Sequence, residues 1–140
     1  MATVKLLTDT EASPEARTVF DDIRKTRKTD YVNNAWRALA NDPKNLARIW
    51  AQAQETMAPG ALDALTKEIV YLTVSIMNDC DYCIHSHSIF ARTKGLSEDQ
   101  YNEMLRVIGL ASELNRLMTA MAVPVDERFE VKSTPAKYAL

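Results

Sequence analysis

Glycine is scarce in this chain and stands at the ends of helical patterns. Only three glycines occur in 140 residues, Gly60, Gly95 and Gly109, and each falls where a stretch of regularly spaced apolar residues stops. Apolar residues that recur every three to four positions lie on one face of an α-helix, and glycine is favoured just after a helix ends. The sequence therefore predicts an all-α fold whose helices are separated at these glycines.

Cap and breaker residues set the limits of six to seven predicted helices. Pro14 and Pro43 are first-turn signals, and Ser97 with Gln100 forms a capping-box pattern. The segment 61–77 is rich in β-branched residues, which leaves a strand open, but its length favours a helix. The predicted helices span residues 14–28, 31–40, 43–57, 61–77, 80–94, 97–108 and 111–123.

The length of the chain fits a single globular domain. With 46% hydrophobic residues, it is large enough for one core and small enough for oligomer contacts to matter. We predict an N-terminal extension over residues 1–12, a helical domain over 13–123 and a C-terminal tail over 124–140. The large apolar residues expected in the core or at a subunit interface are Phe20, Trp36, Trp50, Leu114, Met118 and Met121.

Charge and hydropathy exclude several classes of protein. Seventeen basic and nineteen acidic residues give a net charge of -2, with no basic stripe of the kind that binds nucleic acid. The longest apolar stretch, residues 69–77, is far shorter than the roughly 20 residues that span a bilayer, and the first residues do not resemble a secretory signal. We therefore expect a cytoplasmic protein that binds neither nucleic acid nor membranes. In that compartment a lone cysteine pair points to catalysis or metal binding.

The two cysteines form a cluster with a histidine and a glutamate. Cys80 and Cys83 are the only cysteines, His87 follows the second by four residues, and Glu68 precedes the first by twelve. On a helix, residues four apart lie one turn above each other, so His87 can reach the sulfur of Cys83. An imidazole beside a thiol can take its proton, and the thiolate attacks disulfides and peroxides. The cluster predicts thiol redox chemistry.

The position of the cysteines at the start of a predicted helix supports this interpretation. Asn78 and Asp79 are expected to form a break and an N-cap ahead of a helix that begins at Cys80. Unpaired N–H groups and the macrodipole at such an end favour a thiolate. Two cysteines separated by two residues in a first helical turn can also approach closely enough for a disulfide. A reversible dithiol is therefore geometrically available.

The same residue types also occur in metal sites and as ordinary solvated side chains. A zinc site from Cys80, Cys83, His87 and Glu68 is chemically acceptable, but structural zinc sites usually take a second ligand pair from a distant segment. Glu68 is either a functional partner or a solvated first-turn carboxylate. His85 lies on a different side of the predicted helix from Cys83, so we assign it no contact with that sulfur.

The order of these four residues resembles a known family. Glu68, eleven residues, Cys80, two residues, Cys83, three residues and His87 is similar to the motif of alkylhydroperoxidase D-like proteins in the carboxymuconolactone decarboxylase superfamily. The resemblance implies an all-helical fold that assembles into homo-oligomers (dimers, trimers or hexamers), and a peroxidase or thiol-disulfide activity. It also implies a hydroperoxide substrate and an external dithiol reductant, either a lipoyl domain or a thioredoxin-like protein. No organic cofactor or metal is implied.

The resemblance assigns roles residue by residue. It implies that Cys83 reacts with peroxide, that Cys80 resolves the product, and that Glu68 and His87 form a proton relay. Tyr82 stands where the best-known members have a histidine; it can donate a hydrogen bond, but a pKa near 10 makes a phenol a poor base. Two alternatives remain: a lyase like the decarboxylase branch of the superfamily, which has no redox thiol pair, and a non-enzymatic redox adaptor or sensor.

Overall fold

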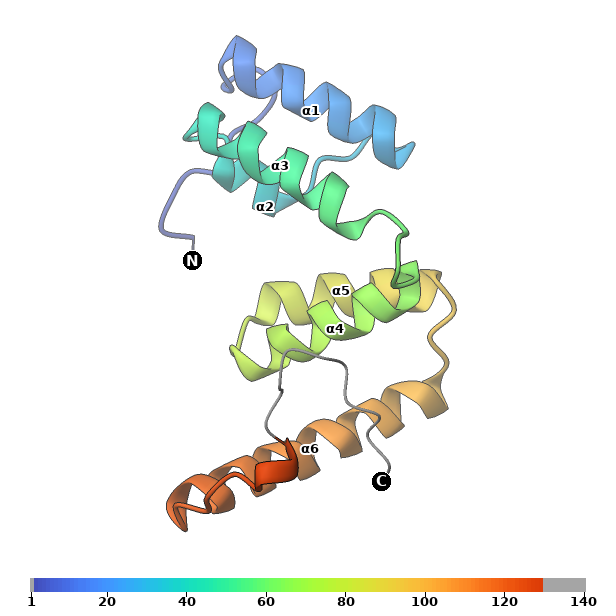
Figure 1. The fold of residues 1–140 in the computed structure, drawn as a ribbon. Coiled ribbons are helices and arrows are strands. Elements are labelled where there is room, and N and C mark those ends of the chain that lie inside the picture. The colour runs from blue at the N-terminus through green and yellow to red at the C-terminus, as the bar shows by residue number, and fades with distance from the viewer. Residues whose placement is uncertain (1, 130–140) are drawn as a thin grey trace. The chain divides into compact units, whose positions relative to one another are not determined.

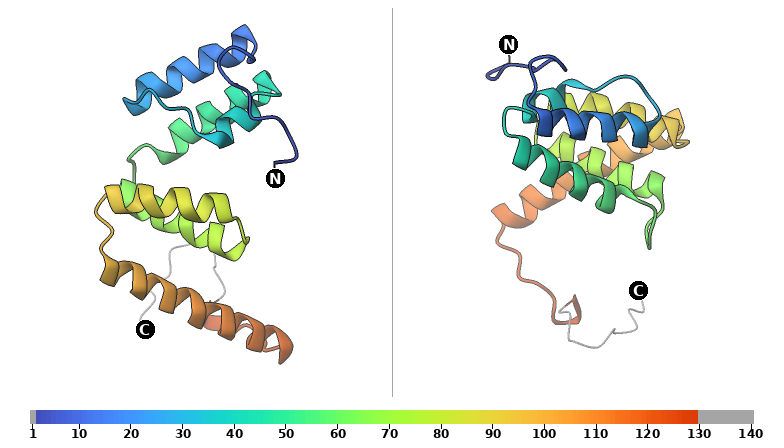
Figure 2. Two further views of the ribbon diagram at one scale, coloured as in Figure 1. Left: turned by 180° about the vertical axis from the view of Figure 1, so that it is seen from behind. Right: turned by 90° about the horizontal axis from the view of Figure 1, so that it is seen from above.

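The chain folds into α-helices, as the computed structural model shows for residues 2–129 (Figures 1 and 2). Within these described residues there is no β-strand, which confirms the all-α prediction. The chain divides into two compact units, residues 1–67 and 68–140. The helices are α1 (Pro14–Arg27), α2 (Asn34–Leu39), α3 (Pro43–Met57), α4 (Ala64–Met77), α5 (Asp81–Thr93) and α6 (Glu98–Ala120), followed by the 3-10 turn η1 (Glu127–Phe129).

Helices α1 and α3 start where the sequence predicted, whereas α2 starts at Asn34, three residues after its predicted start. The Ser13 hydroxyl accepts a hydrogen bond from the backbone N–H of Ala16 at 3.2 Å, and Pro14 follows in the first helical turn of α1. Asp42 caps α3 in the same way, since its carboxylate accepts from the N–H of Asn45 at 3.1 Å. These caps satisfy N–H groups that have no partner inside the helix. The predicted starts of both helices are confirmed.

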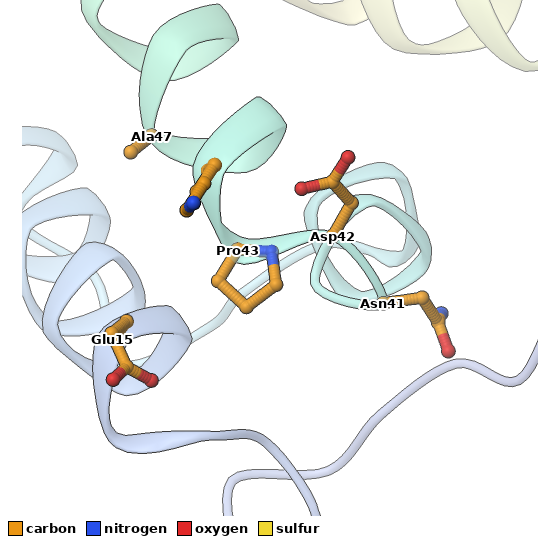
Figure 3. A pocket seen from close by; sticks show the side chains of 6 residues that line it. Glu15, Asn41, Asp42, Pro43 and Ala47 are labelled. Atoms are coloured by element: carbon orange, nitrogen blue, oxygen red, sulfur yellow. The ribbon is translucent and has the colours of Figure 1, made fainter.

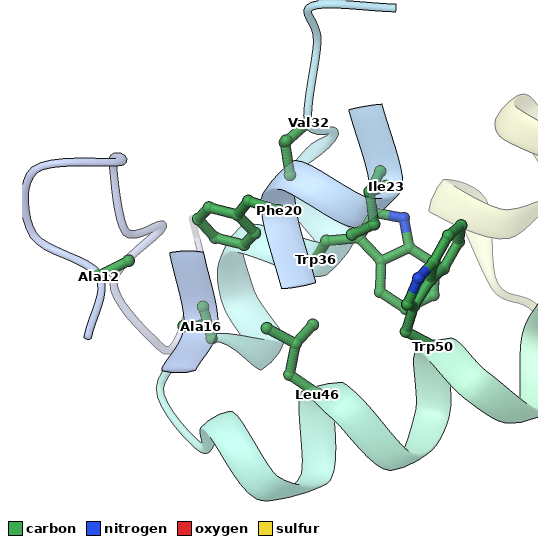
Figure 4. Close-up of a cluster of buried hydrophobic side chains, with 9 residues drawn as sticks. Ala12, Ala16, Phe20, Ile23, Val32, Trp36, Leu46 and Trp50 are labelled. Carbon is green, nitrogen blue, oxygen red and sulfur yellow. The ribbon is translucent and has the colours of Figure 1, made fainter. Parts of the chain in front are cut away.

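Helices α1, α2 and α3 enclose a dense apolar core (Figure 4). Phe20, Ile23 and Leu46 are fully buried, and the rings of Trp36 and Trp50 meet edge to face with centroids 5.2 Å apart. The expected core positions of Phe20 and both tryptophans are confirmed. Complete burial of these large side chains supplies the main apolar contribution to the stability of this unit.

The N-terminal segment is tied to the same core. The backbone N–H of Leu7 donates to the carbonyl of Arg37 at 3.2 Å, and the Arg37 guanidinium donates back to the Leu7 carbonyl at 2.9 Å. Asp9 forms ion pairs with Arg24 and Arg37. Residues before α1 are therefore part of the first unit. The larger division into an extension, one domain and a tail stays a prediction, and residues 130–140 of that tail lie outside the described residues.

In the second unit, a tight turn joins α4 to α5. Asp79 adopts a left-handed conformation with φ of 53°, and the N–H groups of Asp79 and Cys80 donate to the carbonyls of Ile76 and Ser75. This is the hydrogen-bond pattern of a Schellman motif, in which aspartate replaces the usual glycine. The N-cap of α5 is Cys80, not Asn78 or Asp79 as predicted, because those residues are used to end α4.

A second turn joins α5 to α6. Gly95 has φ of 101°, and the N–H of the buried Leu96 donates to the Ala91 carbonyl at 3.0 Å. Ser97 and Gln100 then form both hydrogen bonds of a capping box, as predicted. The positive φ explains why glycine stands at position 95, because a side chain there would be strained.

One prediction for the C-terminal helices is wrong. Residues 98–120 form one continuous helix of 23 residues, and Gly109 lies inside it instead of separating two helices. Of the two positions expected for Leu114, Met118 and Met121, the core of this chain is excluded, since each side chain is more than 40% exposed. Their alternative position, at a subunit interface, stays a prediction. Among the described residues no helix is long and apolar enough to cross a membrane.

Candidate active site

The two thiols lie at the N-terminal end of α5. Cys80 is the N-cap residue, and Cys83 lies in the first turn of the helix. Both are half-buried and neither is in a disulfide. The backbone N–H of Cys80 closes the end of α4, while its carbonyl accepts the first hydrogen bond of α5 from Ile84 at 2.9 Å. The backbone of Cys80 is thus fixed by hydrogen bonds to α4 and α5, and its side chain takes no part in these two bonds.

A buried carboxylate connects α4 to α5. The side chain of Glu68 is only 4% exposed, and its two oxygens have different partners. Oε2 lies 2.7 Å from Nδ1 of His87, and Oε1 accepts a hydrogen bond from Nζ of Lys94 at 2.6 Å. Burial alone would raise the pKa of Glu68, but the hydrogen bonds and charges of His87 and Lys94 outweigh it, so the pKa lies below its usual range. Glu68 is therefore an anion at neutral pH.

The contact with Glu68 fixes the tautomer of His87. An ionised carboxylate can only accept hydrogen bonds, so the proton of a neutral His87 must lie on Nδ1. The lone pair is then on Nε2, on the opposite side of the ring. His87 is 15% exposed and lies one helical turn after Cys83. The geometry of the pair therefore gives α5 a basic nitrogen that faces away from the carboxylate.

Aromatic rings hold the imidazole in place. Tyr71 stacks on His87 with ring centroids 3.6 Å apart and planes inclined by 18°, and Phe90 meets His87 edge to face at 5.5 Å. Burial raises the pKa of Tyr71, and the Glu68 carboxylate, together with Cys83 and Cys80 whenever these thiols are deprotonated, raises it further. The Tyr71 phenol thus shares one local environment with both sulfurs and with the carboxylate.

The surroundings of Cys83 favour the thiol in the reduced protein. Burial raises the pKa of Cys83 to about 11, and a hydrogen bond with Cys80 and the charge of Cys80 act in the same direction. This is opposite to the expectation that His87 and the helix end hold Cys83 as a thiolate. The physical reason is that the partly buried sulfur loses solvation and lies beside a second sulfur, that of the N-cap residue Cys80.

The structure brings some predicted residues together and leaves others apart. Glu68 and His87 are in direct contact, and His87 and Cys83 are one turn apart on α5. Tyr82 lies between the cysteines and is 42% exposed. His85 is exposed, as expected for a residue on another side of the helix from Cys83.

Sequence reasoning missed two residues of this site. Lys94 binds the carboxylate, and Tyr71 covers the imidazole. A signal was present for each of them. Lys94 follows His87 by seven residues and Tyr71 follows Glu68 by three, so each pair lies on one face of its helix.

Other features of the described residues give no competing site. They do not bring three or more His, Cys, Asp or Glu side chains together as candidate metal ligands, so the geometry does not support the zinc alternative. A cavity of about 660 Å³ lies in the first unit, where α1 and α3 begin (Figure 3). Its lining, which includes Glu15, Asp42 and Lys44, contains no thiol or histidine. Both thiols of the chain lie in the second unit.

Comparisons with known proteins agree with this site. Residues 43–126 match the carboxymuconolactone decarboxylase family. The chain is 32% identical over 91 residues to alkyl hydroperoxide reductase AhpD of Solibacter usitatus, a match covering 65% of this chain and 50% of that protein, so it spans about half the length of that relative. The crystal structure of the alkylhydroperoxidase AhpD core from Rhodospirillum rubrum is 55% identical, with a TM-score of 0.90 over 94% of this chain and 99% of that one. The chain therefore belongs to the carboxymuconolactone decarboxylase family, as an AhpD-like member.

Proposed function

We propose that this protein is a thiol-dependent peroxidase that reduces hydroperoxides through Cys80 and Cys83. One observation carries the proposal: the first turn of α5 holds both thiols, and His87, one turn later, is bonded to a buried, ionised Glu68. That arrangement combines a nucleophile, a base and a group that orients the base. The names of the similar proteins point to the same class of activity.

The first step is the oxidation of Cys83. Because Cys83 is a thiol at neutral pH, its proton must leave as the sulfur attacks the peroxide. Nε2 of His87 accepts this proton, and Glu68 stabilises the resulting imidazolium through Nδ1–H. The sulfur takes the distal oxygen, the O–O bond breaks, and the departing alkoxide leaves as an alcohol after it receives a proton. Cys83 is then a sulfenic acid.

The second step closes the disulfide. The Cys80 thiol attacks the sulfur of the Cys83 sulfenic acid, an S–S bond forms, and water leaves. An external dithiol then reduces the disulfide and is itself oxidised to a disulfide; a lipoyl domain or a thioredoxin-like protein has this chemistry. Tyr82, between the two sulfurs in sequence, is a candidate hydrogen-bond donor in this cycle. The cycle requires no resident cofactor, and we assign it to the cytoplasm, where dithiol donors are kept reduced.

Turnover by cysteine variants tests the proposal. With cumene hydroperoxide and dihydrolipoamide, Cys83→Ser should abolish steady-state peroxide consumption. Cys80→Ser should consume one equivalent and then stop. If both variants keep full turnover, or if the unmodified protein is oxidised stoichiometrically without turnover, the peroxidase proposal is wrong. The second result would instead identify a redox sensor.

A histidine pair supplies a matched control for the base. His87→Gln should lower the rate of peroxide consumption by about 10²-fold or more, which is the usual contribution of a positioned general base. His85→Gln changes an exposed histidine on the same helix and should leave the rate unchanged. Equal rates for the two variants would exclude His87 as the base.

A further inference from the structure

Lys94 contacts the buried Glu68 carboxylate from the solvent side, and the peroxidase cycle does not itself explain this contact. Its Nζ donates to Oε1 of Glu68 at 2.6 Å while His87 occupies Oε2 at 2.7 Å. The three side chains are 35%, 4% and 15% exposed in the order Lys94, Glu68 and His87. The carboxylate is thus enclosed between a permanent cation and a titratable ring.

We propose that Lys94 is a positioning residue: by holding the second oxygen of Glu68, it keeps the carboxylate ionised and His87 neutral, with its proton on Nδ1. The consequence for catalysis rests on the proposed function, because only a neutral His87 can accept the proton of Cys83. The effect on His87 itself does not depend on that function.

Counting the charges gives the physical reason. With Lys94 protonated, Glu68 ionised and His87 neutral, the cluster has no net charge, so a proton added to His87 places an uncompensated positive charge in a poorly solvated site. Without Lys94, the Glu68 carboxylate has only His87 as its partner. A buried carboxylate then favours an imidazolium beside it, and the imidazolium has no lone pair for a thiol proton.

The other titratable groups near His87 do not replace Lys94. From α4, Tyr71 stacks on the ring, and from α5, Cys83 lies one turn before it, with Cys80 at the start of the helix. Tyr71 and Cys83 both have raised pKa values and are uncharged at neutral pH. Among the described residues, α6 brings no charged group into contact with Glu68 or His87. Lys94 is therefore the residue whose positive charge balances the negative charge of the Glu68 carboxylate.

The fold fixes Lys94 for this role. Lys94 is the C-cap of α5, and its backbone N–H donates to the carbonyls of Phe90 and Ala91 at 3.2 and 3.0 Å. It lies two helical turns after His87, and its ammonium group is 5.9 Å from the centroid of the Phe90 ring. The turn at Gly95 ends the helix directly after it, so the side chain extends back along α5 toward Glu68.

A titration of the two histidines tests the proposal directly. The chain has only His85 and His87, so their imidazole proton resonances can be assigned in the reduced protein with a His85→Asn variant. Lys94→Met should raise the titration midpoint of His87 by at least about one pH unit, which is tenfold in proton affinity, and should leave His85 unchanged. Lys94→Arg should restore the original midpoint.

The control is a cation that does not contact the carboxylate. Arg92 lies on the same helix turn but pairs with Glu98 at 2.9 Å, so Arg92→Met should not move His87. An unchanged His87 midpoint in Lys94→Met would overturn the proposal, as would an equal shift in Arg92→Met. If Lys94→Met does not fold, Lys94→Gln makes the same test.

The proposal and the peroxidase function fail separately. If His87 shifts in Lys94→Met but the unmodified protein consumes no peroxide, the peroxidase function is wrong and the role of Lys94 stands. If peroxide is consumed, the acid limb of the rate profile should move upward with the His87 midpoint in Lys94→Met. Turnover with an unmoved midpoint would contradict the role of Lys94 alone.

Discussion

The two units of this chain bury different kinds of side chain. The first unit encloses nine apolar residues, among them Phe20, Leu46 and two tryptophans, in one cluster. Among the described residues of the second unit, the buried positions are four apolar side chains and three polar ones: Leu72, Ala91, Leu96, Met104, Glu68, Ser75 and Ser88. The burial of large apolar side chains is therefore concentrated in the first unit. The second unit buries Glu68 and two serines and leaves large apolar side chains exposed.

Among the helices of the second unit, α6 carries the most exposed large apolar residues. Leu110, Leu114 and Met121 are 45–59% exposed, and α4 adds Val70 and Val74. A unit of this size with so few buried apolar residues does not gain enough from its own core to be stable alone. We therefore expect a second copy of the chain to cover this face, in agreement with the predicted homo-oligomer.

The largest expected effect tests the core of the first unit. Phe20→Ala should lower the free energy of unfolding by about 3–5 kcal/mol, because it empties a fully buried site. Leu117→Ala, at a position that is 44% exposed, should cost less than about 1 kcal/mol at high dilution. Urea unfolding gives both values. Equal losses of unfolding free energy in the two variants would mean that the two units do not differ in how far apolar burial stabilises them.

The second effect tests the buried carboxylate through its pH dependence. Glu68→Gln should cost about 3 kcal/mol at pH 7, because two donors lose a buried anion. The folded pKa of Glu68 lies below its ordinary 4.5, so its ionised form stabilises the fold above that pH, and this contribution disappears as the pH falls through the folded pKa. Urea unfolding of both proteins from pH 7 to pH 3 should show the difference shrinking only below about pH 4.5. A difference that grows on acidification would refute this account of Glu68.

The third effect tests the apolar face of α6. A Leu114→Glu and Met118→Glu double variant should dissociate the expected oligomer, because charges at a buried contact cost about 2 kcal/mol or more per site. Light scattering measures the mass in solution. Arg116→Glu, a charge change on the same helix, serves as the control. A monomeric unmodified protein would show that no second copy covers this face.

The smallest effect concerns two glycines with opposite expectations. Gly109→Ala should stabilise the protein by about 0.5–1 kcal/mol, since the residue is inside α6 and an added Cβ meets no atom within 4 Å beyond its chain neighbours and the local helix backbone. Gly95→Ala should destabilise it by about 1 kcal/mol or more, because its φ is 101°. The thermal unfolding midpoints of the two variants, compared with that of the unmodified protein, measure both effects. Destabilisation by Gly109→Ala would indicate that something packs against this position.

Local signals predicted most of the helices. Pro14, Pro43 and the Ser97 capping box act within one turn of chain, and the structure confirms all three helix starts. Gly109 misled the prediction because glycine costs a helix only about 1 kcal/mol, less than the gain from continuing it on both sides. Cys80 became the N-cap because Asp79 accepts the left-handed conformation that ends α4.

The sequence predicted some residues of the candidate site and missed others. The pairing of Glu68 with His87 was implied by the family resemblance, whereas the contact between Glu68 and Lys94 joins residues 26 positions apart and depends on how α4 and α5 pack. The stacking of Tyr71 on His87 has the same origin. The raised pKa of Cys83 also depends on packing, because burial of a sulfur cannot be read from its spacing.

The central claim is that Cys83 is oxidised and Cys80 resolves it. Mass spectrometry of the cysteine peptide after one equivalent of hydroperoxide tests this most directly. The account predicts an intramolecular Cys80–Cys83 disulfide in the unmodified protein, a sulfenic acid on Cys83 in Cys80→Ser, and no oxidation in Cys83→Ser. Unoxidised thiols in the unmodified protein, or a sulfenic acid on Cys80 in Cys83→Ser, would contradict it.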